Sequence, residues 1–170
     1  IDKVVAPTNK TELQSLMGKI NFIRRFISNL SGKIQPFSAL LKLRADQEFV
    51  WGEAQQKALE AIKQYLVSPP VLIPPQKGKP FKLYLSADDR AIGSALIQGF
   101  EGKERVIYYV SRRLLDAETR YLPLEKLVLA LIHTTRKLPH YFQAHIVYIL
   151  TEYHLQSLLK RSDFTGRIAK

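Results

Sequence analysis

The chain has 170 residues, with 26 Lys and Arg against 15 Asp and Glu, so its net charge is +11. Its 46% hydrophobic content supports a folded core of one domain or two small ones, and the absence of cysteine excludes disulfides and thiolate zinc sites. No apolar run approaches the roughly 20 residues that span a bilayer, so we expect no membrane partner, and the spread positive charge favours nucleic acid over a merely solvated lysine-rich surface.

The N-terminal part predicts three helices. A helix is expected from Asn9 to about Asn29, with Asn9 and Glu12 as a capping box. Ser31-Gly32 interrupts the pattern, and a shorter helix with Pro36 in its first turn follows. A third helix is predicted from Glu53 to Val67. Apolar residues recur at helical spacing in the first of these helices, at Leu13, Leu16, Met17, Ile20, Ile23 and Ile27.

The proline-rich stretch "SPPVLIPPQKGKP" cannot be helical and marks a boundary near residue 70. Beyond it the apolar period changes to two, and "FKLYLS", "IGSALI" and "RVIYYVS" predict three strands. "PLEKLVLALIHTTRKLPHYF" predicts one long helix that starts at Pro123, because proline suits the first turn. "HIVYILTE" predicts a fourth strand and "HLQSLLK" the start of a further helix, which gives the order βββαβα.

This order resembles the ribonuclease H-like fold and, more narrowly, the polymerase polyprotein of gypsy-class long-terminal-repeat retrotransposons. Five blocks carry the resemblance: "TNKTELQSLMGKINFIRRFI", "EFVWGEAQQKALEAIKQYLVSPPVL", "AIGSALIQ", "YYVSRRLLDAETRYLPLEKLVLALI" and "LTEYHLQSLL". The fourth block is most similar to plant elements.

The resemblance implies an α+β fold in two parts. Residues 1–70 would form a three-helix, thumb-like bundle of a reverse transcriptase. Residues 71–170 would form a ribonuclease H-like, connection-type domain that lacks the last strand and helix of that fold. We expect the chain to be a fragment of an RNA-directed DNA polymerase/ribonuclease H, located in a cytoplasmic particle or the nucleus, with no activity of its own.

The resemblance also implies positions for a nuclease site, which in this family uses four acids and two divalent metals. Aligned on "AIG", the first catalytic Asp falls on Ser86, the helix Glu on Glu125 and the third acid on Glu152, while the fourth has no counterpart. A neutral serine is a poor replacement for a bridging carboxylate, so we expect a degenerate site with no metal and no cofactor.

A working ribonuclease H that uses Mg²⁺ with Asp88, Glu125 and Glu152 is the alternative. Asp88 shares a strand face with Ser86 but lies about 6.8 Å further along, beyond the reach of a simple ligand exchange. Asp88 and Asp89 are also typical of a hairpin turn.

The stretch "QSLMGKINF" resembles the first thumb helix of retroviral reverse transcriptases, which lies in the minor groove of the template–primer. The matching Gln14, Gly18 and Phe22 would form one helical stripe that contacts bases and sugars. The alternative is that Gly18 packs against a helix and Phe22 is core. Cations that would contact phosphates are Lys10, Lys19, Arg24 and Arg25.

The sequence therefore predicts a module that binds template–primer or RNA–DNA hybrid without sequence specificity, beside the remainder of its polyprotein. A structural module for docking or homodimer formation is the second alternative.

Overall fold

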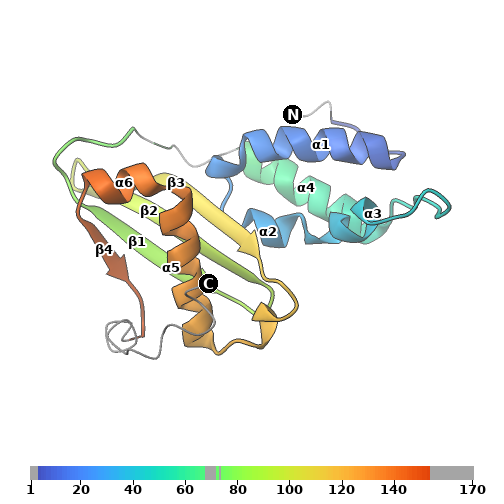
Figure 1. The fold of residues 1–170 in the computed structure, drawn as a ribbon. Coiled ribbons are helices and arrows are strands. Elements are labelled where there is room, and N and C mark those ends of the chain that lie inside the picture. Colours follow the sequence, from blue (N-terminus) through green and yellow to red (C-terminus); the bar gives the residue numbers. More distant parts are fainter. Residues whose placement is uncertain (1–3, 68–71, 73, 154–170) are drawn as a thin grey trace.

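The computed structural model describes residues 4–67, 72 and 74–153. Within these ranges a group of helices is followed by a four-stranded sheet with helices on one face (Figure 1), which confirms the predicted α+β class. The longest of these helices have 15 residues and do not reach the length and hydropathy of a membrane-spanning helix. The helix predicted to begin at "HLQSLLK" lies outside the described residues.

Helix α1 spans Lys10–Phe22 and starts at Asn9, as predicted. The Asn9 side chain accepts a hydrogen bond from the Glu12 backbone N–H at 2.9 Å. This bond satisfies one of the N–H groups that a helix start leaves without an intrahelical partner. The Glu12 carboxylate accepts the Thr8 backbone N–H at 2.8 Å, so it fixes the chain that enters the helix, and its bonds to Thr8 lower the pKa of Glu12.

The predicted continuation of this helix to Asn29 is wrong. α1 ends at Phe22, and a 3-10 turn, η1, follows at Arg24–Phe26. The Ile23 N–H bonds to the carbonyl three residues earlier, at 3.2 Å, and this closes the helix with a tight turn. Asn29 then adopts φ 45°, and its side chain caps the next helix. The apolar spacing continued past the true end because Ile27, beyond the turn, is buried again.

Three short segments and one long helix complete the helical part. The predicted break at Ser31-Gly32 is wrong, because both residues lie inside a short helix. Pro36 lies in the first turn of a segment, as predicted, but that segment is a 3-10 turn with a separate short helix after it. The last helix has the predicted bounds. The segments are α2 (Leu30–Lys33), η2 (Gln35–Phe37), α3 (Ser38–Leu41) and α4 (Glu53–Val67).

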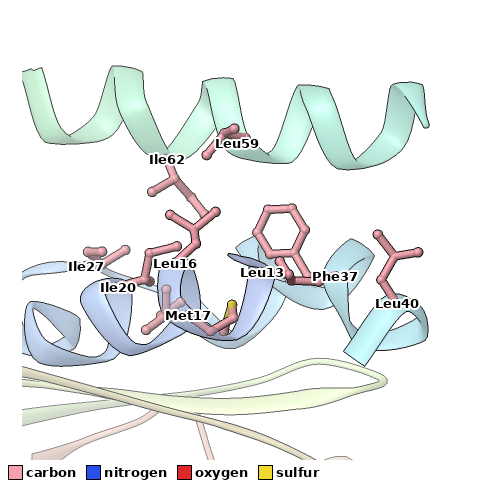
Figure 2. Close-up of a cluster of buried hydrophobic side chains, with 10 residues drawn as sticks. Leu13, Leu16, Met17, Ile20, Ile27, Phe37, Leu40, Leu59 and Ile62 are labelled. Atoms are coloured by element: carbon pink, nitrogen blue, oxygen red, sulfur yellow. The ribbon is translucent and has the colours of Figure 1, made fainter. Parts of the chain in front are cut away.

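One apolar core holds the helical part together (Figure 2). Phe37 is fully buried at its centre, and its ring stacks on that of Trp51 with 5.5 Å between centroids. The face of α1 that packs inward meets α4 there, so the opposite face of α1 is left to solvent. The buried members are Leu13, Leu16, Met17, Ile20, Ile27, Leu30, Phe37, Leu40, Leu59 and Ile62.

The sheet is mixed and has the strand order β3-β2-β1-β4. β1 pairs antiparallel with β2, β2 pairs antiparallel with β3, and β1 pairs parallel with β4. Glu101 and Gly102 between β2 and β3 both have positive φ, as tight hairpin turns require. The strands are β1 (Phe81–Ala87), β2 (Ala91–Phe100), β3 (Lys103–Arg113) and β4 (Val147–Leu150).

Two helices cover one face of this sheet. α5 (Pro123–Lys137) starts at the predicted proline, but the single helix predicted through Phe142 is interrupted, because a second proline starts α6 (Pro139–Ala144). A buried hydrogen bond of 2.7 Å between the Ser94 and Thr134 hydroxyls links β2 to α5. The apolar core between sheet and helices contains Phe81, Leu83, Leu96, Ile107, Val110, Leu131 and Leu138.

Gln98, in β2, fixes the connector that enters the sheet. Its buried side chain accepts the Gln76 N–H at 2.7 Å and donates to the carbonyls of Gln76 and Lys79, each at 3.0 Å. A buried amide is stable only when such partners are present. The end of the connector is therefore held on the sheet and does not act as a loose linker there.

Replacing Phe37 with Ala should lower the free energy of unfolding by about 3–5 kcal/mol, because it leaves a cavity in the helical core. Phe22→Ala is the matched control: Phe22 is 88% exposed, so its loss should change stability by less than about 0.5 kcal/mol. Chemical denaturation of both variants measures the difference. Equal losses would contradict the assignment of Phe37 to the core and Phe22 to the surface.

Candidate functional site

The exposed face of α1 carries the three residues of the predicted stripe. Gln14, Gly18 and Phe22 are all exposed, while the buried residues of the helix face the core. A Cβ built at Gly18 would meet no atom within 4 Å, so this glycine makes no close packing contact within the described residues. Phe22 is 88% exposed. The alternative that Gly18 packs against a helix and Phe22 belongs to the core is therefore not what the structure shows.

The four predicted phosphate-binding cations do not share one environment. The Lys10 ammonium donates to the Leu43 carbonyl at 2.6 Å, which ties α1 to the end of α3. Lys19 is exposed on α1 beside the stripe. The Arg25 guanidinium lies over the rings of Phe26 and Tyr108, at 5.5 and 5.4 Å from their centroids. Lys19 therefore lies next to the stripe. Lys10 is bound to a backbone carbonyl, and Arg25 packs against the sheet.

A second candidate site lies where β1 and β4 end. A cavity of about 520 Å³ is lined there by Ser86, Glu152, Tyr153 and the start of α5 at Pro123. Glu125 lies in the first turn of α5 and its carboxylate accepts the Leu122 backbone N–H at 2.9 Å. Two of the three positions matched to catalytic acids therefore line one cavity, and the third caps the helix beside it.

These residues do not fit a two-metal centre. Ser86 presents a neutral hydroxyl, one Glu125 oxygen is engaged in the helix cap, and Glu152 is one carboxylate beside a tyrosine. Hard cations such as Mg²⁺ require several oxygen ligands that converge, usually carboxylates. Among residues 4–67, 72 and 74–153 there is no group of three or more His, Asp or Glu side chains that could hold a metal ion.

Asp88, the possible substitute ligand, has a structural role at the hairpin between β1 and β2. Its carboxylate accepts the backbone N–H groups of Arg90 at 2.8 Å and Ala91 at 2.6 Å. The ammonium of Lys126, which is buried on α5, lies 3.3 Å from the Asp88 carbonyl. The Asp88 side chain is therefore directed into the turn that it closes.

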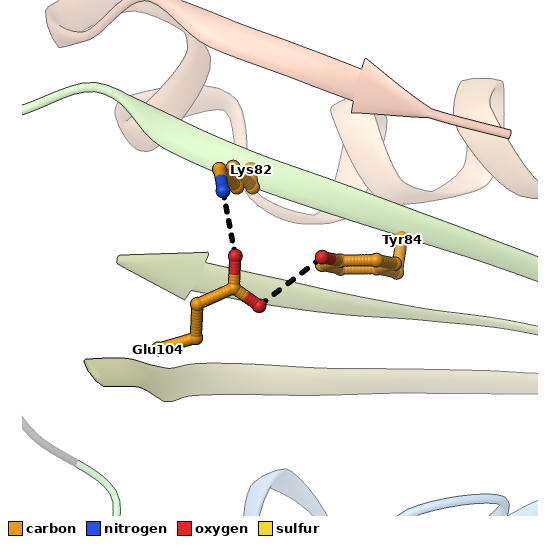
Figure 3. Close-up of polar contacts among 3 residues, drawn as sticks. All are labelled: Lys82, Tyr84 and Glu104. Carbon is orange, nitrogen blue, oxygen red and sulfur yellow. Dashed lines mark hydrogen bonds and ion pairs between the residues drawn. The ribbon is translucent and has the colours of Figure 1, made fainter. Parts of the chain in front are cut away.

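Sequence reasoning missed a polar cluster on the open face of the sheet (Figure 3). The Glu104 carboxylate accepts the Lys82 ammonium at 2.6 Å and the Tyr84 hydroxyl at 3.1 Å. These bonds lower the pKa of Glu104, chiefly through Lys82, and the bond to Glu104 raises the pKa of both Lys82 and Tyr84. Tyr84 also lines the cavity at Ser86, so the cluster orients one of its walls. Only the strand register brings these residues together, and no sequence motif predicts this register.

The strand order and the long helix α5 on one face define a ribonuclease H-like fold. Residues 51–149 match the family described as the RNase H-like domain found in reverse transcriptase. Because this match covers more than half of the chain, the chain belongs to that family. The matched region begins before α4, within the helical part.

Relatives and solved structures agree with this assignment. The Transposon Tf2-3 and Tf2-4 polyproteins of Schizosaccharomyces pombe are 35% identical over 150 residues, covering 86% of this chain but only 11% of each polyprotein. A foamy viral protease-reverse transcriptase in complex with dsDNA is similar with a TM-score of 0.74 and 26% identity, over 94% of this chain and 33% of that one. The same enzyme in complex with RNA/DNA hybrid shares the fold, with a TM-score of 0.75 and 22% identity over 95% of this chain and 22% of that one.

Asp88→Ala should lower the free energy of unfolding by about 1 kcal/mol, because two backbone N–H groups of the hairpin lose their acceptor. Asp89→Ala is the control, since the Asp89 side chain makes no hydrogen bond with any residue in the described ranges. Urea denaturation compares the two. If both variants lose the same stability, Asp88 does not have the special role in the turn that its two bonds indicate.

Proposed function

We propose that the chain is the thumb and connection part of a gypsy-class, plant-like retrotransposon reverse transcriptase, divided into residues 1–70 and 71–170. Its function is to bind template–primer or RNA–DNA hybrid without sequence specificity, beside the rest of a polyprotein that works in a cytoplasmic particle or the nucleus. The chain spans about a tenth of the Tf2 polyproteins, so this role concerns the part and not the whole.

The observation that carries the proposal is the exposed stripe on α1. Phe22 is a large apolar side chain left almost wholly in solvent at the end of a helix, so its ring is available to pack on a sugar. Gly18 has open space over its backbone, so a sugar could approach there more closely than any side chain would permit. Gln14 adds an amide that can bond to bases or sugars in the minor groove without a demand on sequence.

The net charge of +11 supports the same role, because binding to the phosphate backbone is electrostatic and does not depend on sequence. The foamy viral reverse transcriptases that share the fold are described in complexes with RNA/DNA hybrid and with dsDNA. Binding of either duplex by this chain should weaken steeply as salt rises.

We also propose that the nuclease site is degenerate. With serine at position 86, the charge needed to hold two divalent cations close together is missing, and their repulsion would not be offset. Glu125 has a sufficient structural reason to be present, because its carboxylate accepts the backbone N–H of Leu122 at the start of α5. The ribonuclease H-like part then serves as a scaffold beside a polymerase and a nuclease located elsewhere in the parent.

Phe22→Ala should weaken the binding of a labelled RNA–DNA hybrid roughly tenfold, because aromatic contacts contribute about 1–3 kcal/mol to nucleic-acid binding. Gln14→Ala should have a smaller effect of the same sign. Gln64→Ala is the control, since Gln64 is an exposed glutamine on α4. Fluorescence anisotropy at low salt gives the affinities.

If the hybrid does not bind at low salt, or both α1 variants bind like Gln64→Ala, the binding role is wrong. Sedimentation of the same samples then shows whether self-association, as expected for a homodimer or docking module, takes its place.

Incubation of hybrid with the protein and Mg²⁺ or Mn²⁺ should give no cleavage, because the carboxylates required for two metals are missing. The informative control is Glu125→Gln, which keeps the helix cap because glutamine can also accept the Leu122 N–H. Cleavage by the wild type that Glu125→Gln abolishes would support the working nuclease with Asp88, Glu125 and Glu152 instead.

A further inference from the structure

The seam between the helical part and the sheet is formed by η1 and α2 against β3. The Ser31 backbone N–H donates to the Ser111 hydroxyl at 3.0 Å. The Arg25 guanidinium lies over the Tyr108 ring at 5.4 Å, a cation–π contact that joins η1 to the sheet. These contacts fix where the end of α1 points, since η1 begins two residues after Phe22.

Positive side chains from three elements gather at this seam around His133. They are Arg24 of η1, Arg112 of β3 and Lys137 in the last turn of α5. Burial first, and then Arg112, Lys137 and Arg24, lower the pKa of His133, so its imidazole is neutral near pH 7. Burial and Arg24 likewise lower the pKa of Lys137. Each of the three cations therefore acts on His133, and Arg24 also acts on Lys137.

Little negative charge offsets them. Glu118 of η3 (Glu118–Arg120) is the one acid that raises the pKa of His133, and it is paired with Arg112 at 2.9 Å. Its second oxygen accepts the Leu115 N–H at 2.7 Å. Neither Arg24 nor Lys137 forms an ion pair with any residue in the described ranges.

Two buried nitrogen atoms at the seam could contact an anion. Arg112 Nε and His133 Nε2 are buried and have no hydrogen-bond partner among the described residues. Buried polar atoms without partners are rare in folded proteins, and an ion is one of the partners that can account for them. An anion bound here would offset the positive charges and could accept hydrogen bonds from these nitrogen atoms.

We propose that Arg24, Arg112 and Lys137, around His133, form a binding site for a backbone phosphate of the duplex that lies along α1. This inference rests on the proposed function and extends its contact surface from α1 to β3 and α5. In Figure 1 the end of α1 leads into the part of the chain that packs on β3, where the seam lies. A single duplex could therefore contact the α1 stripe and the seam in succession.

The chemistry suits a phosphate rather than a base. Arginine and lysine are the usual partners of phosphate oxygens, and such contacts fix the position of a duplex without reading its sequence. A phosphate at the seam would offset the repulsion between Arg24 and Lys137. A neutral imidazole beside them can donate a hydrogen bond and adds no further positive charge.

Hybrid binding across a salt series tests this site. Lys137→Gln should weaken binding and reduce the slope of log K against log salt by about 0.9, the value for one phosphate contact. Arg136→Gln is the matched control, because Arg136 is the exposed neighbour in the same helical turn and loses the same charge. Its slope should stay near that of the wild type. Equal changes in the two variants would overturn the site.

Two further measurements keep the test independent of folding. Without nucleic acid, Lys137→Gln should melt no lower than the wild type, because the charge that it removes is opposed by Arg24. On addition of hybrid, the ring signals of His133 should shift in NMR spectra of the wild type, and its pKa should rise as a phosphate offsets Arg24, Arg112 and Lys137 beside Glu118. Unchanged His133 signals in a saturated complex would count against the site.

The outcomes separate this site from the proposed function. If the wild type binds no hybrid, the proposed function fails, and the seam site with it. If Phe22→Ala weakens binding but Lys137→Gln equals Arg136→Gln, only the seam site fails. If polyglutamate binds the wild type and Lys137→Gln reduces that affinity but not the affinity for hybrid, the seam binds acidic protein segments and the phosphate site is wrong.

Discussion

The packing of η1 and α2 against β3 sets the geometry of the rest of the molecule. The turn at the end of α1 is held on the sheet by Arg25 over Tyr108, and α2 is held there by the bond from Ser31 to Ser111. The direction of α1 depends on these contacts together with the helical core. At the other end of the helical part, Gln98 holds the returning connector on β2. The helices therefore contact the sheet through η1 and α2, and the segment that enters β1 is fixed on the sheet separately.

In the ribonuclease H-like part, carboxylates at the ends of the strands have structural roles. The architecture at the ends of β1 and β4 depends on hairpin capping by Asp88 and helix capping by Glu125, and both use carboxylates for backbone N–H groups. Neither role needs a metal. An acid near a sheet end is weak evidence for catalysis when its oxygen atoms already have a structural partner.

Much of the fold was predictable because it depends on local patterns. The cap at Asn9, the bounds of α4, the proline at the start of α5 and the alternation in β1 are each encoded within a few residues. The end of α1 was not predictable in this way. Ile27 would be buried whether the helix continued to Asn29 or ended at Phe22. The apolar pattern alone therefore does not show that the chain turns after Phe22; the packing of Ile27 in the assembled core does.

The candidate site likewise has a part that the sequence predicts and parts that only the folded structure shows. The stripe of Gln14, Gly18 and Phe22 follows from helical spacing, and the structure adds that its face is open. The cluster of Lys82, Tyr84 and Glu104 depends on strand register, and the seam around His133 depends on three elements that are distant in sequence.

Because electrostatic effects act through space, the meaning of a charged residue changes with its neighbours. Lys10 and Lys19 both lie on α1 and look equivalent in the sequence. The first is bound to the Leu43 carbonyl, and the second remains exposed. A basic chain of this kind therefore has fewer phosphate contacts available than its net charge suggests, because a cation that a neighbouring group already holds contributes less to binding.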